Sequence, residues 1–430
     1  MRLIYVDLAT PKRLNFYPLA LSRPIWELRC GMTSLFDKML DKIETTDVAC
    51  FLPPYMAEVY RATTSRPVND PAVLDGDDLL LVDARVKADQ FDVAATGPSE
   101  IAVDSDGELV YARIARADLA KLTTDSIEGL IDSAKQSLPA VDANVAVWNY
   151  TWELVLENPD QLTKDFAAIG HHGIEGTIEE PRAIRGSAKD VFVADGVVIH
   201  PMVVLDAAEG PIYIDEDAEI HPFTRIEGPC YIGKKSILLG AKCREGNSIG
   251  PMCRVGGEVE ESIIHGYSNK YHDGFLGHAY VGEWVNLGAL TTNSDLKNDY
   301  SSVSVILDGK APINTGSTKV GALIGDHTKT SIGTLFNTGA YVGAMTLIAG
   351  TGKPLPKFIP SFGWFLEGVV TKGFGKRKLY ETAKTAMSRR GREWTPADEA
   401  MWDEIFNLTK GPRMNAVKKG RRLMAAAHGR

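Results

Sequence analysis

An aliphatic residue recurs every six positions through the middle of the chain, and few folds accommodate such a period. These positions are Val193, Ile199 and Leu205, then, after a three-residue insertion, Ile214, Ile220, Ile226, Ile232 and Leu238, then Ile249 and Val255, and later Val281 and Leu287. The next residue is often glycine or a small or acidic residue, as in Ile249-Gly250. Helical heptads cannot produce a period of six, and a strand of period two would not place glycine after every third apolar residue.

Short strands that turn a corner every six residues explain this pattern better than a generic β-sandwich does. Each aliphatic side chain then points inward and stacks on its equivalents in neighbouring coils, while the small residue allows a tight corner. Residues 184–351 are therefore predicted to form a parallel β-helix.

Residues 1–175 instead alternate apolar runs with amphipathic segments. Strands are expected at Leu3–Val6, Val48–Leu52 and Leu79–Val82, and helices at Leu35–Ile43, Asp125–Gln136 and Thr151–Phe166. Runs that are apolar throughout are typical of parallel strands buried on both faces. This part is predicted to be a layered α/β domain.

Residues 352–430 break the repeat again. Lys353-Pro354-Leu355-Pro356 is expected to stop the β-helix, because proline cannot donate to a strand ladder. Helices are expected at Lys378–Arg389 and Ala397–Leu408, the second one after the cap Thr395-Pro396, and this extension would cap the open end of the β-helix. From Lys410 to Arg430 the chain is basic and has no acid, which is consistent with a solvated, frayed tail or with a contact to a phosphate-bearing ligand, polyanion or partner subunit.

Composition excludes several classes of function. The net charge of −9 makes nucleic acid a poor partner, and no apolar run is long enough for a membrane span. The five cysteines show no C-x-x-C pair, which argues against a disulfide framework or a zinc site and for a reducing, cytoplasmic compartment. No metal ligands are predicted.

Polar residues concentrate between about Lys242 and Asp299, where the repeat phase is noisiest. The segment His265-Gly266-Tyr267-Ser268-Asn269-Lys270-Tyr271-His272-Asp273-Gly274-Phe275-Leu276-Gly277 is followed by Asn286-Leu287-Gly288-Ala289 and by Asn293-Ser294-Asp295. A purely structural β-helix needs small or solvated residues here, so the cluster indicates a functional site.

These motifs, with the six-residue repeat, resemble those of hexapeptide-repeat acyltransferases, and in particular the acetyltransferase half of bacterial bifunctional UDP-N-acetylglucosamine synthases. The sequence of the His265–Gly277 segment is most similar to an alternative, GlmU-like branch of sugar nucleotidyltransferases. The resemblance implies a left-handed β-helix, a homotrimer, and a nucleotidyltransferase-like α/β domain at the N-terminus.

The resemblance also implies roles for individual residues. His272 would be the general base, since histidine has a free pKa near neutrality, with Asn286 and Asn293 positioning the amine and the acyl carbonyl. Arg244, Asn269, Lys270 and Phe275 would contact the substrate. Asn293 could equally stack in an asparagine ladder, and His200, His221, His265 and His278 are interpreted as hydrogen-bonded turn residues.

Two departures from the family pattern affect these roles. The family's Val-Glu-x-Lys is here Val259-Glu260-Glu261-Ser262, so its phosphate-binding lysine is missing, and Lys270 is the expected substitute. Phe275 stands where the family has a catalytic tyrosine, which removes a hydroxyl group.

The N-terminal part lacks the glycine-rich loop with which such nucleotidyltransferases cradle a triphosphate. Arg23 and Arg29 are the candidates to hold phosphate, with Asp83 and Arg85 at the end of a strand. The alternative is that the two arginines pair with Glu27 and Asp37. Mg²⁺ is implied if this half handles a triphosphate.

The predicted function is CoA-dependent acyl transfer, with acetyl-CoA or another acyl-CoA as donor, onto an amino-sugar phosphate or a nucleotide sugar. A sugar-1-phosphate nucleotidyltransferase activity of the N-terminal half would accompany it. The alternatives are a nucleotidyltransferase whose β-helix serves only assembly and a non-catalytic, regulatory scaffold that binds a nucleotide sugar.

Overall fold

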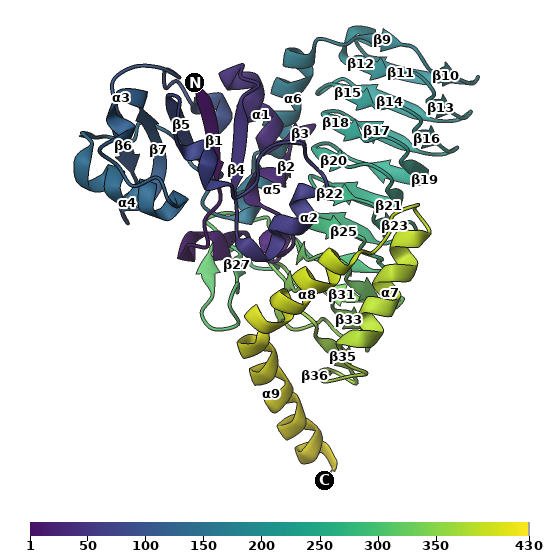
Figure 1. The fold of residues 1–430 in the computed structure, drawn as a ribbon. Helices are drawn as coiled ribbons and strands as arrows, with labels where there is room; N and C mark the ends of the chain where they lie inside the picture. The colour runs from purple at the N-terminus through teal and green to yellow at the C-terminus, as the bar shows by residue number, and fades with distance from the viewer. Residues whose placement is uncertain (429–430) are drawn as a thin grey trace. The chain divides into compact units, whose positions relative to one another are not determined.

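The computed structural model describes residues 1–428, which divide into two compact units (Figure 1). The first unit contains Met1–Phe16, Ser22–Leu28 and Thr33–Asn149. The second contains Tyr17–Leu21, Arg29–Met32 and the chain from Tyr150 onwards. In the part of the chain that the structure describes, no helix is both long enough and apolar enough to cross a membrane.

The first unit is built on a six-stranded mixed sheet in the order β4-β1-β5-β7-β6-β8. Its strands are β1 (Arg2–Val6), β4 (Val48–Phe51), β5 (Leu79–Asp83), β6 (Glu100–Val103), β7 (Leu109–Ile114) and β8 (Ala140–Val141). β4, β1 and β5 are parallel, as the apolar runs predict, whereas β7 is antiparallel to both of its neighbours. The α/β prediction for this part is confirmed.

Helices pack around this sheet, and the first and the last of them lie where the amphipathic segments predict helices. They are α1 (Leu35–Ile43), α2 (Ala57–Arg61), α3 (Arg116–Leu119) and α4 (Ile127–Ser137). Ser34 caps α1 by accepting from the backbone N–H of Asp37, whose carboxylate accepts from Ser34 in return. The expected helix over Thr151–Phe166 is two helices of the second unit, α5 (Thr151–Leu156) and α6 (Asn158–Ile169).

The second unit is a parallel β-helix, as the six-residue period predicts. Each coil crosses three faces, here named A, B and C. Face A contains β9 (Gly173–Ile174), β12 (Val191–Val193), β15 (Ile212–Ile214), β18 (Cys230–Ile232), β20 (Asn247–Ile249), β22 (Ile263–Gly266), β25 (Tyr280–Glu283), β29 (Leu323–Ile324), β32 (Tyr341–Val342) and β34 (Phe358–Ile359).

The other two faces share strands that bend around the corner between them. Face B contains β10 (Thr177–Ile178), β13 (Val198–Ile199), β16 (Glu219–Ile220), the first halves of β19 (Ile237–Cys243) and β21 (Arg254–Glu260), β23 (Asn269–Lys270), β30 (Lys329–Thr330), β33 (Leu347–Ile348) and β35 (Trp364–Leu366). Face C contains β11 (Ala183–Gly186), β14 (Val204–Ala207), β17 (Arg225–Glu227), the second halves of β19 and β21, β24 (Phe275–Gly277), β26 (Thr292–Asn293) and β31 (Leu335–Phe336).

The aliphatic residues of the repeat form the core of this unit. Ile214, Ile220 and Ile226, one from each face, have no exposed surface. Stacking these side chains coil upon coil buries a continuous apolar column, which no single coil could achieve alone. One hairpin, β27 (Ser304–Val305) with β28 (Ile313–Asn314), is inserted between β26 and β29.

The β-helix does not end at Lys353-Pro354-Leu355-Pro356, so that prediction is wrong. β34 continues face A beyond the prolines, and β35 continues face B. The prolines lie in the connection before β34, where neither position is required to donate, and Leu355 between them still donates its N–H to the Leu335 carbonyl at 2.9 Å.

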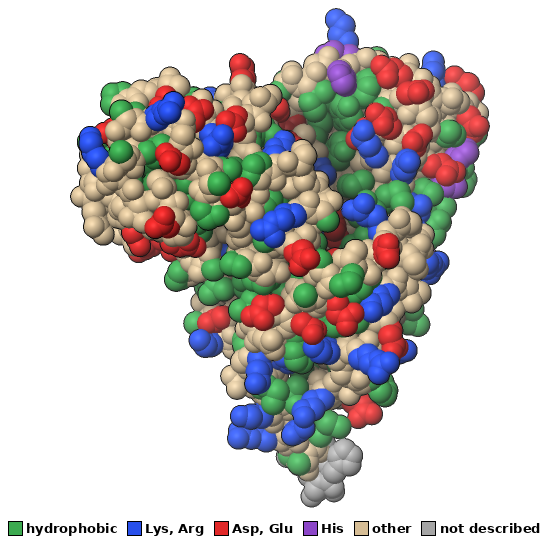
Figure 2. Space-filling model, viewed as in Figure 1, with side chains coloured by type: hydrophobic (Ala, Val, Ile, Leu, Met, Phe, Trp, Pro, Cys, Tyr) green, Lys and Arg blue, Asp and Glu red, His purple; other side chains and the backbone are tan. Residues whose placement is uncertain are grey.

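The chain then continues as β36 (Val369–Thr371), antiparallel to β35, and three helices: α7 (Lys376–Ser388), α8 (Pro396–Leu408) and α9 (Lys410–His428). Thr395 caps α8, as its sequence predicts. The basic tail is helical within the described residues, and Arg430 lies outside them. Figure 2 shows basic side chains gathered on α9, where Lys410, Lys418, Lys419, Arg421 and Arg422 are exposed, while Arg413 packs 3.7 Å above the Phe406 ring.

Candidate functional site

A row of polar side chains runs along the outer side of face B. Arg254, Asn269, Asn286 and Lys329 occupy equivalent positions on four successive coils. The Asn269 amide donates to Asn286 Oδ1 at 3.2 Å, and the Arg390 guanidinium donates to Asn269 Oδ1 at 3.2 Å. The sequence-predicted residues Asn269 and Asn286 are thus brought together by the coil register.

A cavity of about 540 Å³ lies between this row and α7. Its walls include the stacked rings of Tyr267 and Trp284, whose centroids are 4.4 Å apart, and the basic side chains of Lys378 and Arg389. The size suits a small organic ligand. The mixture of amides, cations and aromatic rings suits a ligand that carries both anionic and ring groups.

Lys329 contributes an amine to this cavity. Its Nζ donates to the backbone carbonyls of Trp284 and His327. Burial lowers the pKa of Lys329 to about 7, with a smaller opposing effect from Asp326. A lysine with a pKa near neutrality can accept or release a proton under ordinary conditions, or bind an anion by becoming charged. Sequence reasoning missed both Lys329 and Arg390.

His272 lies at the corner between faces B and C and is exposed. Its ring makes an edge contact with Tyr271 at 5.6 Å, and no hydrogen bond of the imidazole is found among the described residues. The corner is held from inside, because the Lys270 ammonium donates to the carbonyl oxygens of His272 and, at 2.8 Å, Gly256.

Lys270 therefore does not occupy the position expected of a substrate-binding residue. It stands at an inward position of face B, in register with Val255, and is only 3% exposed. Burial lowers the pKa of Lys270 to about 8. Its hydrogen bonds join two adjacent coils, which is a structural role.

Asn293 also points inward. It is 1% exposed, and its side chain both accepts from the Gly277 N–H and donates to the Gly277 carbonyl, each at 2.9 Å. This pattern replaces a missing pair of backbone hydrogen bonds between coils, which is a structural role for the Asn293 side chain. Phe275 lies next to Gly277 on face C and is partly exposed.

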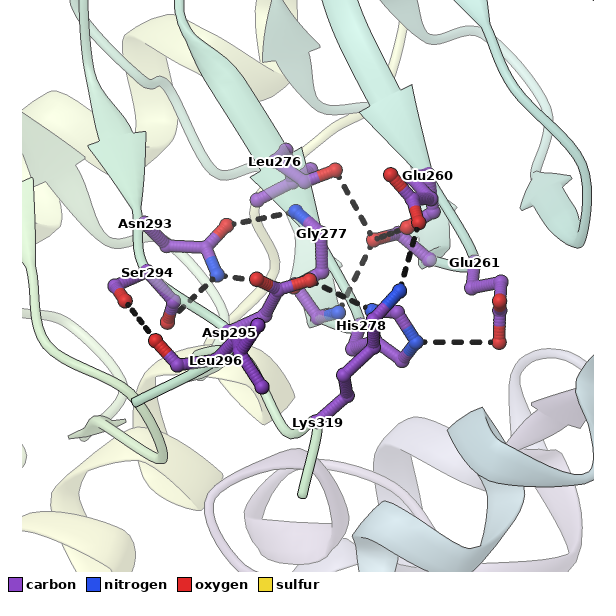
Figure 3. Close-up of polar contacts among 12 residues, drawn as sticks. Glu260, Glu261, Leu276, Gly277, His278, Asn293, Ser294, Asp295, Leu296 and Lys319 are labelled. Atoms are coloured by element: carbon purple, nitrogen blue, oxygen red, sulfur yellow. Dashed lines mark hydrogen bonds and ion pairs between the residues drawn. The ribbon is translucent and has the colours of Figure 1, made fainter. Parts of the chain in front are cut away.

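A charged network surrounds His278, which the sequence suggests is only a turn residue (Figure 3). His278 is 3% exposed in its side chain; Nδ1 lies 2.8 Å from Asp295, and Nε2 lies 3.2 Å from Glu261. The two carboxylates raise the pKa of His278 to about 9, against the opposing effect of burial. The imidazole is therefore held protonated between two anions, which suits an anchor better than a general base.

The same network holds Arg244. Its guanidinium pairs with Glu260 at 2.7 Å, and Lys319 pairs with the other oxygen of that carboxylate at 3.1 Å. Arg244 remains about two-fifths exposed. Neutralisation by Glu260 reduces the charge it could offer to a phosphate.

In the first unit, charged side chains follow the carboxyl ends of the parallel strands, where ligands bind in open α/β sheets. Asp7 follows β1 and pairs with Arg13 at 3.0 Å, with both side chains 2% exposed. Asp83 ends β5 and accepts from Arg85 Nε at 2.8 Å. Burial raises the pKa of Asp83 to about 6, although Arg85 opposes the change.

The predicted phosphate-binding arginines belong to two different units of the structure. Arg23 is buried in the first unit, where its backbone carbonyl accepts from Arg13. Arg29 belongs to the second unit, where it contacts the Met32 carbonyl and lies 5.3 Å from the Tyr231 ring centroid. Arg85 is 2% exposed and turned toward acidic residues.

The family model described as sugar nucleotidyl transferase matches residues 6–172. This match covers the first unit and the start of the second. It identifies the nucleotidyltransferase-like segment despite the missing glycine-rich loop.

Curated relatives are bifunctional proteins. The chain is 38% identical over 152 residues to the bifunctional sugar-1-phosphate nucleotidylyltransferase/acetyltransferase of Sulfurisphaera tokodaii, covering 33% of this chain and 35% of the relative. It is 27% identical over 210 residues to bifunctional protein GlmU of Thermotoga sp., covering 44% and 43%, and 29% identical over 228 residues to that of Methanococcus maripaludis, covering 52% and 48%.

The chain thus spans between about a third and a half of the length of these relatives. By these findings the chain is similar to the bifunctional GlmU-type proteins, and it combines a segment that matches the sugar nucleotidyl transferase family model with a parallel β-helix.

Proposed function

We propose that this chain is a transferase of sugar-nucleotide biosynthesis that moves an acyl group from a CoA thioester to an amino-sugar phosphate or nucleotide sugar. The observation that carries this proposal is the cavity over the Asn269–Asn286–Lys329 row, on the β-helix of a chain similar to nucleotidyltransferase/acetyltransferase proteins. Acetyl-CoA is the donor that the relatives' names favour.

The cavity is proposed to hold the anionic part of the acceptor. Arg389 and Arg390 supply positive charge, whereas Lys378 is paired at 3.0 Å with Glu381 on the same wall; Lys329 becomes charged when a phosphate approaches. Asn269 and Asn286 offer amide groups that distinguish hydroxyl and carbonyl positions of a sugar. The Tyr267–Trp284 stack provides a flat apolar surface for a ring.

His272 is proposed as the general base. The acceptor's amine or hydroxyl loses a proton to the imidazole as it attacks the thioester carbon, and the acyl–nitrogen or acyl–oxygen bond forms. As the carbon–sulfur bond breaks, the imidazolium returns that proton to the sulfur, so that CoA leaves as the thiol and His272 is neutral again. The exposed corner position allows approach of substrate, and Lys270 fixes the His272 backbone. Asn286 would stabilise the developing oxyanion. A trimer, in which a neighbouring copy completes the site at such corners, is part of the proposal.

A second candidate, nucleotidyl transfer in the N-terminal half, is favoured by the family match over residues 6–172. Mg²⁺ would be expected for that reaction. The carboxylates at the strand ends, Asp7 and Asp83, are each already paired with an arginine, so this donor set does not fit a magnesium ion.

Acyl transfer is tested by incubating the protein with acetyl-CoA and an amino-sugar 1-phosphate and measuring turnover as release of the free CoA thiol. His272→Ala should lower turnover by about 10²–10⁴-fold, the usual contribution of a positioned base, and leave the melting temperature almost unchanged because the side chain is exposed. His172→Ala, an exposed histidine on the first coil, is the control and should behave as the wild type.

Full turnover by the His272→Ala protein would refute the assignment of the base. Release of pyrophosphate from UTP and a sugar 1-phosphate, with no thiol release from any acyl-CoA, would leave the β-helix with an assembly role only. Binding of nucleotide sugars without either reaction would indicate a scaffold.

A further inference from the structure

Two histidines and two glutamates stack on the first coils of the β-helix, at the end of face B. Glu179, His200 and His221 follow one another at intervals of 21 residues, which is the length of the early coils. Backbone hydrogen bonds of 2.9 Å hold each in register: Glu179 N–H to the Ile199 carbonyl, His200 N–H to Ile220, and His221 N–H to Leu238. The ladder itself therefore places these side chains one above another.

The two imidazoles converge on one carboxylate oxygen. His200 Nε2 lies 3.2 Å from Glu219 Oε1, and His221 Nε2 lies 3.1 Å from the same atom. The other nitrogen of His200, Nδ1, lies 3.0 Å from Glu179. The ring centroids of the two histidines are 5.1 Å apart.

These separations match the edges of a zinc coordination tetrahedron. With zinc–nitrogen and zinc–oxygen bonds of about 2.0–2.2 Å, neighbouring ligand atoms in a tetrahedral site stand about 3.3 Å apart. Two histidines and one glutamate are a zinc ligand set that leaves a fourth position for water. A zinc-ligating histidine commonly donates its other N–H to a carboxylate, the place that Glu179 takes toward His200.

We propose that His200, His221 and Glu219 form a Zn²⁺ site, with Glu179 as the outer carboxylate that orients His200. The absence of C-x-x-C pairs argues only against thiolate zinc sites. All three ligands are partly exposed, at 28%, 29% and 39% of their side chains, so an ion can reach them from solvent.

The charge around the cluster favours a cation. No lysine or arginine pairs with Glu179 or Glu219 among the described residues. A second acidic group of this unit, which contains Glu260 and Glu261, is less suited to a metal ion. Glu260 pairs with Arg244 and Lys319, and Glu261 pairs with His278, so positive side chains already occupy it.

A zinc ion here would clip two successive coils together. His200 belongs to one coil, whereas Glu219 and His221 belong to the next. The stability of a repeat array comes largely from the interfaces between neighbouring repeats, and these two coils share one such interface. Binding is therefore expected to raise the melting temperature of the β-helix, since an ion that binds only the folded state stabilises it by mass action.

The experiment is titration of the full, EDTA-treated chain with Zn²⁺ by calorimetry, and with Co²⁺ by visible absorption. The wild type should bind one equivalent with the bands of tetrahedral Co²⁺ and melt at a higher temperature with Zn²⁺. His200→Ala and His221→Ala should lose the bands and the temperature rise. Glu179→Gln should keep the site but weaken binding by about 10–100-fold, as loss of an outer partner does.

The exposed neighbours His171 and His172 provide the matched control, and replacing both with alanine should leave Co²⁺ binding unchanged. Because His200→Ala also removes the contacts to Glu179 and Glu219, the readout for each variant is the rise in its own melting temperature when Zn²⁺ is added. Absence of binding by the wild type, or binding that survives His200→Ala and His221→Ala, would overturn the proposal.

Discussion

The His278 network makes a specific prediction about stability and pH. The pKa of this imidazole rises from an ordinary 6.5 to about 9 in the folded chain, because Asp295 and Glu261 outweigh burial. A folded-state pKa above the unfolded value means that the stabilisation is fully present below pH 6.5 and is lost as the pH rises through 9. The difference corresponds to about 3 kcal/mol. The pKa values of Asp295 and Glu261 are lowered, so their contribution is lost only in acid.

The perturbation that isolates this effect is His278→Asn. His278 has a φ of 46°, in the left-handed region, which asparagine tolerates better than most residues. The variant keeps a polar side chain and removes the charge. The difference in stability between wild type and variant should therefore shrink by about 3 kcal/mol between pH 6.5 and about pH 9.5, while any packing difference stays constant.

Hydrogen exchange of the amides in β24 and β25, corrected for the intrinsic dependence on pH, measures the free energy of local opening. A local measurement is preferable to global unfolding for this chain, because its two units need not unfold in one transition. His172→Asn serves as a control for a generic loss of histidine. A wild-type-to-variant difference that does not change with pH would refute the network's role.

Four other substitutions separate structural from functional roles. Asn293→Ala should lower the free energy of unfolding by about 2–4 kcal/mol, because two buried backbone groups lose their partners. Asn286→Ala should lower it less, and equal losses for the two variants in urea unfolding would contradict the structural role of Asn293. Arg13→Leu should cost about 3–5 kcal/mol by leaving the Asp7 carboxylate buried without its partner, and an unchanged calorimetric transition would count against this. Lys329→Met should weaken binding of a sugar phosphate by about 10–100-fold in titration calorimetry while raising the melting temperature; unchanged affinity would remove the amine from the proposed site.

The architecture of the β-helix could be predicted because its period follows directly from the geometry of a coil. A residue every six positions must point inward if each side of the coil has that length, and Val193, Ile232 and Val255 are indeed fully buried. Proline is informative only where a ladder needs an N–H. Pro354 and Pro356 lie in a connection, so they do not end the repeat.

The site was harder to predict because the repeat loses its phase between Val255 and Val281. Without coil lengths, an inward polar residue cannot be told from an outward one, so Lys270 and Asn293 looked like ligand-binding residues although both are buried. A signal for the missed His278 was present. Glu261, His278 and Asp295 are each 17 positions apart, one coil in this part of the chain.

Lys329 carried no such signal, because the inserted hairpin separates it from Asn286 by more than one coil length in sequence although the two are paired in space. Likewise, Arg23 and Arg29 are neighbours in sequence but belong to different units. Proximity in sequence was therefore misleading for Arg23 and Arg29, and distance in sequence was misleading for Asn286 and Lys329.

The hairpin of β27 and β28 has a consequence for how such a chain can change over time. The inserted segment that contains this hairpin leaves the coil at one corner. The chain then returns to the coil, where β29 pairs in register with β25 of the preceding coil. Corners of this kind let a lineage acquire or discard residues while the scaffold stays intact. A peptide epitope or small reporter domain spliced between the exposed Lys310 and Ala311 should be accepted for the same reason. New binding surfaces can thus arise by insertion at individual corners while the other coils stay unchanged.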